Sequence, residues 1–179
     1  MNLRIVPEDQ VTAELDAEIR RGLCACFPTD AAAFSTTRAW HGSGPAFSVV
    51  LEEGSVVVAH VGVVDRTIDL DGRALRVAGV QNVYVLPEHR GRWLADQVMA
   101  AAMNEAGRTG YDCGLLFCVP RLTRLYARQG WRLLEGVDVT CLGPTGRDEP
   151  LPGQNVAMWY PLRVRELTGR RMHLCGADW

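Results

Sequence analysis

A short arginine-rich turn is the first segment whose residue types and spacing could do chemistry. Arg90, Gly91 and Arg92 stand between the β-rich run from Val80 to Leu86 and a helical pattern that starts near Leu94. A helix that begins here exposes unpaired backbone N–H groups and the positive end of its dipole, and both attract anions. An ordinary strand-turn-helix junction with exposed arginines has the same spacing. The turn alone is therefore a weak indication of an anion site.

A tyrosine is the second chemical candidate. Tyr126 lies in the segment from Arg121 to Trp131, about one turn before the glycine at Gly130, which is typical of a short helix and its stop. A phenol can act as a proton donor in catalysis. The alternative is an aromatic side chain that only packs in the core.

Four histidines, at His41, His60, His89 and His173, are candidate bases because imidazole titrates near neutral pH. Each of them alone is more often structural or superficial, and the sequence shows no recognisable dyad. The six cysteines form neither a CxxC pair nor a set with zinc-ligand spacing. We therefore expect free thiols and no metal site.

Length and composition favour one globular domain that spans residues 1–179. The chain is 47% hydrophobic and 22% charged, with a formal net charge of −2, and acids and arginines are interleaved along it. No basic stripe is available for nucleic acid, and no apolar run approaches the roughly 20 residues that cross a bilayer. The amino terminus lacks a secretory signal pattern. We expect a cytoplasmic protein without nucleic-acid or membrane partners.

The elements that must position these residues alternate between extended and helical patterns. Helices are predicted at Val11–Cys26 and Trp93–Thr109, and the segment from Phe27 to Pro45 is predicted to be irregular or a broken helix. Four consecutive antiparallel strands are predicted, with turns at Glu52-Glu53-Gly54 and Asp71-Gly72: Ala46–Leu51, Ser55–Val64, Asp65–Leu70 and Ala74–Leu86. Later strands are predicted around a turn-rich excursion from Gly143 to Gly153: Tyr111–Val119, Trp131–Leu134, Val137–Leu142 and Asn155–Pro161.

Taken together, the two segments resemble the GNAT acyltransferase superfamily, in which a strand, a phosphate-binding turn, a long helix, a strand and a short tyrosine-bearing helix follow in this order. Three features are similar to the aminoglycoside 2'-N-acetyltransferases: Arg90-Gly91-Arg92-Trp93-Leu94, Leu125-Tyr126-Ala127-Arg128-Gln129-Gly130-Trp131, and the end at Asp178-Trp179. The Pro144-Thr145-Gly146 turn looks like that family too. The resemblance implies an α/β GNAT fold, with a mixed and mostly antiparallel sheet flanked by helices and with splayed central strands.

The resemblance implies acetyl-CoA as cosubstrate. Backbone groups at Val83 and Val85 would pair with the pantetheine arm, and the turn would bind the pyrophosphate. The residues implied at that turn are Arg90, Gly91, Arg92, Trp93, Leu94 and Ala95. Trp93 stands where most members of the superfamily have a second glycine, the residue at which backbone approaches a phosphate most closely.

The resemblance also implies that Tyr126 is the general acid. Gln81 stands where the aminoglycoside family usually has a glutamate, and an amide cannot accept a proton at neutral pH. Gln81 could instead orient a water or a sugar hydroxyl. The base is left open between Asp178, the terminal carboxylate of Trp179, a chain of waters and the histidines.

Candidate acceptor contacts lie in the irregular segment and at the end of the chain. Trp40 could pack on a sugar ring beside His41, and Asp30 could contact a cation, although an aspartate before small residues is equally a helix cap. The carboxylates of Asp178 and Trp179 could jointly attract an ammonium group, and Gln81 is a further candidate acceptor contact. The alternative for Cys175 to Trp179 is a disordered tail.

The expected function is transfer of an acetyl group from acetyl-CoA to the 2'-amino group of an aminoglycoside antibiotic, which inactivates it. Gln81 and the acid-poor segment at Phe27 to Pro45 suggest a narrower acceptor range, with kasugamycin as the specific hypothesis. One alternative is an acyltransferase for another amino sugar, since Arg38 to Pro45 and Met158 to Leu162 are weakly similar to the nodulation acyltransferases. The other is a degenerate module that only binds coenzyme A. The expected partner is a small amino sugar, and a homodimer is left open.

Overall fold

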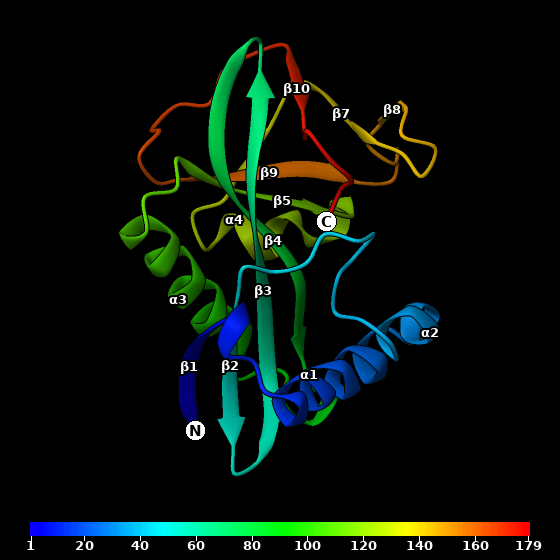
Figure 1. The fold of residues 1–179 in the computed structure, drawn as a ribbon. Coiled ribbons are helices and arrows are strands. Elements are labelled where there is room, and N and C mark those ends of the chain that lie inside the picture. Colours follow the sequence, from blue (N-terminus) through cyan, green and yellow to red (C-terminus); the bar gives the residue numbers. More distant parts are fainter.

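A long antiparallel hairpin forms the centre of the computed structural model, which describes residues 1–179 (Figure 1). Its strands are β3 (Val56–Leu70) and β4 (Arg73–Val85), joined at Asp71 and Gly72. Both turn residues have positive φ, 51° and 83°, as a tight turn between twisted strands requires. The prediction of a break after Val64 is wrong, because β3 is one strand of 15 residues. The side chain of Asp65 forms an ion pair with Arg76 of β4. The four predicted segments therefore form three strands, β2, β3 and β4.

The length of β3 allows one of its edges to pair twice. β2 (Phe47–Glu53) pairs with its first half, and β10 (Arg171–His173) pairs with its end. β1 (Asn2–Pro7) adds to β2. The rest of the ten-stranded sheet follows the order β6-β9-β5-β4-β3-β10-β7-β8. The residue ranges of the other strands are β5 (Cys113–Cys118), β6 (Arg132–Leu133), β7 (Asp138–Leu142), β8 (Asp148–Pro150) and β9 (Val156–Pro161).

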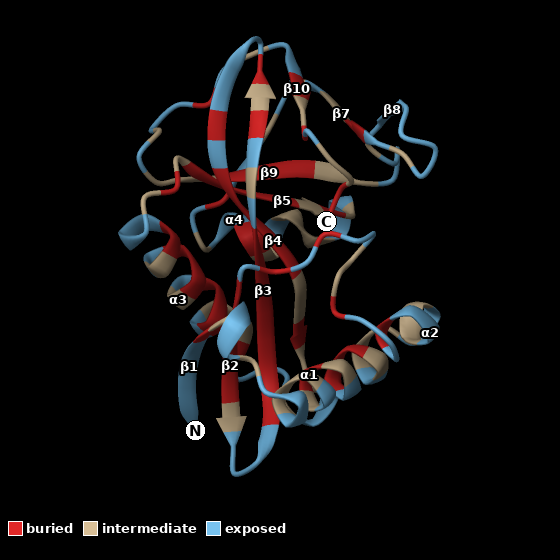
Figure 2. Ribbon diagram, viewed as in Figure 1, coloured by how far each residue is buried: buried red, intermediate tan, exposed pale blue.

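Helices cover both faces of this sheet. α3 (Leu94–Arg108) buries Val98, Met99 and Ala102 against one face, and α1 (Ala13–Cys26) buries Ile19 and Leu23 against the other (Figure 2). The helices α2 (Ala31–Phe34) and α4 (Thr123–Ala127) are short. Single 3₁₀ turns occur at Glu8–Gln10, Pro28–Asp30, Pro87–His89 and Pro120–Leu122. The mixed α/β sheet flanked by helices is confirmed.

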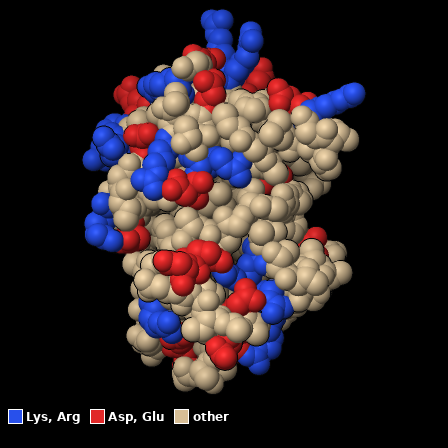
Figure 3. Space-filling view, viewed as in Figure 1, with Lys and Arg blue, Asp and Glu red and all other residues tan.

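Charges of both signs are interspersed on the face that Figure 3 shows, with arginines projecting at its upper end. No helix of the protein has the length and apolar character needed to cross a bilayer.

The predicted helices at Val11–Cys26 and Trp93–Thr109 are confirmed to within two residues at each end. The short strands β1, β8 and β10 were not predicted.

A buried polar network lies under the segment that links α2 to β2. His60 hydrogen-bonds through Nδ1 to the Asn82 carbonyl, 2.9 Å, and through Nε2 to the Ser48 hydroxyl, 3.2 Å. Arg38 reaches the same hydroxyl and pairs with Asp16 at 2.6 Å. The pKa of His60 is lowered to about 4, mainly by burial; the Asn82 carbonyl opposes this shift and the nearby Arg38 adds to it.

We predict that His60 makes the folded state acid-sensitive. The unfolded chain takes up a proton as the pH falls through 6.5, but the folded protein does so only near pH 4. The free energy of unfolding should therefore fall between these values by about 3 kcal/mol. Urea unfolding across this range, with His60→Gln as the non-titrating control, measures the effect. An equal loss in the two proteins would contradict it.

Candidate active site

The site is organised by the point at which β4 and β5 separate. The two strands pair in parallel only from Val77 to Val80 on β4 and from Cys113 to Leu116 on β5. Beyond these residues, β5 continues to pair with β9 and β4 with β3. Backbone polar groups on the facing edges are left without a sheet partner, and such groups need another partner or water. This arrangement can accept an extended ligand between the strands.

The turn that follows β4 presents an uncapped helix end. No side chain caps α3, and Asp96 of its first turn points its carboxylate at Arg128 and Gln129 instead. The N–H groups of the first turn of α3 are therefore free of any side-chain acceptor. Gly91 and Trp93 both have positive φ, 77° and 59°. The residues predicted to bind a pyrophosphate thus form a backbone that suits an anion.

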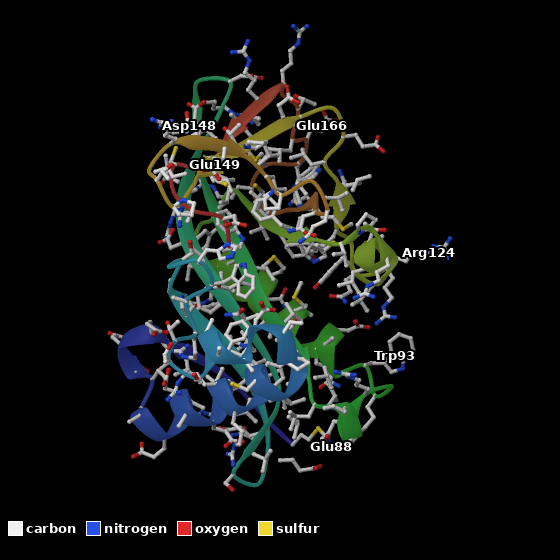
Figure 4. The ribbon with its side chains drawn as sticks, turned by 90° about the vertical axis from the view of Figure 1, so that its right-hand side faces the viewer. Glu88, Trp93, Arg124, Asp148, Glu149 and Glu166 are labelled. Carbon is white, nitrogen blue, oxygen red and sulfur yellow. The ribbon has the colours of Figure 1, made fainter.

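Trp93 occupies a left-handed conformation that glycine adopts without strain. Its side chain is 63% exposed and lies under the guanidinium of Arg128, 4.4 Å from the ring centre. Figure 4 shows Trp93 and Arg124 projecting outward at the same edge, Trp93 from the residue before α3 and Arg124 from α4. The bulky ring points away from the body of the protein, so the backbone turn keeps its shape without the second glycine.

The two arginines of the turn have local partners. Arg90 Nε donates to the Val85 carbonyl at 3.2 Å, and Arg92 lies 3.0 Å from the ring of His89. Both arginines are exposed. The Val85 carbonyl is thus engaged within the protein, whereas Val83 has no hydrogen-bonded side chain on its backbone groups. Pairing of Val83 and Val85 with a ligand stays a prediction.

Tyr126 approaches the separation of the strands from the α3 face. It packs with Leu116, Cys118 and Trp131 in one core cluster and is 8% exposed. Burial raises the pKa of its hydroxyl to about 12, and the neighbouring Cys118 adds to the shift. The phenol is therefore protonated near neutral pH. This burial is compatible with both interpretations of the residue, proton donor and packed aromatic.

Trp179 approaches the same point from the opposite face. Its indole packs against Gly79 of β4 and Phe117 of β5, and its N–H donates to the Leu115 carbonyl at 3.4 Å. A side chain at Gly79 would collide with the indole ring, so this glycine is required by the close approach. The end of the chain is folded, and the alternative of a disordered tail is wrong.

Gln81 holds a tight turn of the irregular segment. Its Oε1 accepts from the Trp40 N–H at 3.3 Å, and its Nε2 donates to the Ser43 carbonyl at 2.8 Å. The Ser43 N–H in turn donates to the Trp40 carbonyl at 2.7 Å. Gln81 is 4% exposed. Both the oxygen and the nitrogen of the Gln81 amide thus hydrogen-bond the backbone of the turn. The sequence had suggested an amide that is free to orient a water or a sugar hydroxyl.

The turn brings His41 to the end of the chain. His41 Nδ1 lies 2.5 Å from Asp178 Oδ1, and its ring stacks on Trp40 at 4.6 Å. Figure 1 shows the carboxyl terminus beside the loop that follows α2. Of the predicted acceptor residues, Asp30 alone stays apart, since its side chain hydrogen-bonds only Thr29 and makes no cap for α2.

Two residues that the sequence did not single out hold this cluster together. Arg66 donates to the carbonyls of Leu174 and Ala177, at 3.3 and 3.2 Å, and its guanidinium lies over the Trp179 ring. Ser43 donates to the Asp178 carbonyl at 3.0 Å. No local pattern marks either residue, because the partners just named at the end of the chain are more than 100 positions away.

Surface hollows lie elsewhere. A hollow of about 440 Å³ between α3 and the end of β9 is lined in part by Asn104, Tyr160 and Arg163. A second, of about 280 Å³, is lined in part by Asp96 and Gln129. No group of three or more His, Cys, Asp or Glu side chains is placed to hold a metal ion. Neither of these two hollows is lined by His41, Tyr126 or Asp178.

The chain is similar to known proteins in both sequence and fold. The chain is 30% identical over 139 residues to an aminoglycoside 2'-N-acetyltransferase from Mycolicibacterium fortuitum, which covers 75% of this chain and 68% of that protein. A GNAT family N-acetyltransferase (YhbS) from Escherichia coli, solved in complex with CoA, has a TM-score of 0.64 at 19% identity and covers 97% of this chain and 89% of its own.

A GNAT family acetyltransferase from Brucella melitensis, solved in complex with acetyl-CoA, has a TM-score of 0.57 at 19% identity and covers 86% of this chain and 97% of its own. A family model described as an acetyltransferase (GNAT) domain matches residues 11–134, which include β4, the turn, α3 and α4. Since that match takes in most of the chain and the fold agrees throughout, the protein belongs to the GNAT acetyltransferase family.

Proposed function

We propose that the protein transfers an acetyl group from acetyl-CoA to the 2'-amino group of an aminoglycoside. The observation that carries the proposal is the two-sided opening between β4 and β5. A tyrosine reaches it from the α3 face, and a histidine, a carboxylate and two tryptophans lie on the other face. An aromatic ring suits the apolar face of a sugar, and of the two tryptophans Trp40 is partly exposed whereas Trp179 is buried. A carboxylate attracts an ammonium group. The 30% identical relative supports the same acceptor class.

Acetyl-CoA supplies the activated acetyl group when it is bound. In the proposal, the unpaired edge of β4 near Val83 holds the pantetheine arm, and the uncapped start of α3 holds the pyrophosphate. Arg90 and Arg92 add attraction to the phosphates. The backbone N–H near Val83 polarises the acetyl carbonyl, and Tyr126 gives its proton to the sulfur.

A panel of acceptors tests the function directly. Release of the coenzyme thiol is measured with a pair of aminoglycosides that differ only in an amino or a hydroxyl group at C2', and with kasugamycin. We expect release with the amino compound and none with its partner. Release with kasugamycin alone would narrow the substrate to the hypothesis drawn from the sequence. Release only with longer acyl donors would replace the proposal by the amino-sugar acyltransferase. The absence of release with every amine tested would replace it by the binding module.

For the coenzyme, we predict that Arg92→Ala raises the dissociation constant of CoA about three- to tenfold and weakens its dependence on salt. The reason is that an exposed guanidinium attracts phosphate mainly through a screened charge. Isothermal titration calorimetry at low and high salt measures both effects. Arg108→Ala, at the other end of α3, is the matched control. Equal CoA affinities in the two variants would show that the phosphates bind elsewhere.

For the proton donor, we predict that Tyr126→Phe lowers kcat by roughly 10²-fold while the free energy of unfolding changes little. The ring and its packing are kept, and only the hydroxyl is lost. Tyr160→Phe is the control, since Tyr160 packs on the other side of Trp131. Wild-type turnover in Tyr126→Phe would leave this residue as a packed aromatic.

A further inference from the structure

His41 has a carboxylate partner that the sequence does not reveal. Its Nδ1 lies 2.5 Å from Oδ1 of Asp178, a residue 137 positions away. The imidazole side chain is 50% exposed, whereas the Asp178 side chain is 11% exposed. This is the only hydrogen bond that the ring makes. One ring nitrogen is therefore fixed by a carboxylate, and Nε2 is free to meet a ligand.

The backbone at His41 is strained. Its φ is 45° and that of Gly42 is 82°, the two positive values of a type I′ turn between Trp40 and Ser43. A histidine in this conformation costs of order 1 kcal/mol, and such strain persists only where the surroundings impose it. Here Gln81 and the bridge between Trp40 and Ser43 impose it. The molecule thus keeps an imidazole at a turn position that favours asparagine or glycine.

Asp178 is held as firmly as His41. Its backbone carbonyl accepts from Ser43 Oγ, and Arg66 fixes the preceding carbonyl and covers the Trp179 ring. Arg66 also donates to Ser43 Oγ at 3.0 Å. The carboxylate and the imidazole are thus anchored to the same serine. Arg66 and Asp178 are the charged side chains that contact this turn.

The other histidines lack this arrangement. His60 is buried, with both nitrogens bonded. His173 pairs with Asp148 at 3.0 Å, but its second nitrogen accepts from the Cys175 N–H at 3.1 Å. His89 contacts Arg92 and is 3.8 Å from Glu53. Only His41 combines a hydrogen-bonded carboxylate with a free nitrogen.

We propose that His41, oriented by Asp178, is the general base that deprotonates the acceptor amine. The carboxylate fixes the tautomer with the proton on Nδ1, which leaves the Nε2 lone pair to accept. Asp178 acts through His41 and is a positioning residue. This inference rests on the proposed function, because it needs an ammonium acceptor. It also gives the chain a base at a site where Gln81 cannot serve.

The protons balance as follows. The acceptor ammonium gives one proton to His41 Nε2, which passes it to solvent. The freed amine nitrogen forms a bond to the acetyl carbon, and the bond from that carbon to sulfur breaks. The sulfur takes the Tyr126 proton, and the second amine proton restores the tyrosine through solvent. The net products are the amide, the free thiol and one proton.

Two substitutions at His41 keep the turn. His41→Asn creates the Asn-Gly pair that type I′ turns favour, and His41→Gly opens space for added imidazole. We expect kcat to fall roughly 10²-fold in both, with an unchanged CoA dissociation constant, and imidazole to restore part of the rate to His41→Gly. His173→Asn, which breaks the pair with Asp148, is the matched control and should keep its rate. A rise in KM alone, or unchanged turnover, would overturn the proposal.

A readout without turnover separates this proposal from the proposed function. Long-range ¹H–¹⁵N spectra of the protein alone report which nitrogen of neutral His41 carries the proton. We expect the Nδ1–H form, and loss of that preference in Asp178→Asn. The Nε2–H form in the wild-type protein would overturn the dyad whatever the acceptor is. If no aminoglycoside is acetylated but the Nδ1–H form is found, the proposed function fails and the oriented base stands.

Discussion

The brief pairing of β4 with β5 is the constraint on which the rest of the site depends. Four residues of each strand are paired, and then the strands go to different neighbours. Side chains alternate between the faces of a sheet, so the opening is approached by different groups from each side. Leu116 and Cys118 share a core cluster with Tyr126 on one face. Leu115 and Phe117 share another with Trp179 on the other face. A two-sided site follows from ordinary strand geometry.

On the proposed coenzyme side, the decisive property is a backbone conformation and not a residue type. Trp93 has a φ of 59°, which costs an L-residue roughly 1–2 kcal/mol relative to the right-handed region. Its ring lies outside the turn under Arg128, so the side chain does not obstruct the backbone N–H groups. A sequence motif that requires glycine at this position does not match the turn. The physical requirement behind the pattern is nevertheless met.

Local periodicity was enough to predict α1, α3 and the Asp71-Gly72 hairpin, because each depends on residues close in sequence. The break assigned within β3 was wrong because the polar residues Asp65 and Arg66 do not interrupt the strand, and Asp65 forms an ion pair with Arg76 of β4. Strands of three residues, such as β8 and β10, carry too few side chains to show a period. The contact between His41 and Asp178 joins two segments that meet only after the chain has folded, so no spacing could predict it.

The amide at Gln81 supports the proposal that the base lies on the loop. The Trp40 N–H needs an acceptor and the Ser43 carbonyl needs a donor, and one amide supplies both. A carboxylate at this position, as the resemblance to the aminoglycoside family would suggest, offers acceptors only. It would leave the Ser43 carbonyl without its donor and would bury a charge at a site that is 4% exposed, and both changes are costly. The residue that seats the turn therefore cannot also be the base. In this chain the turn that Gln81 holds carries an imidazole to the same face of the strand opening.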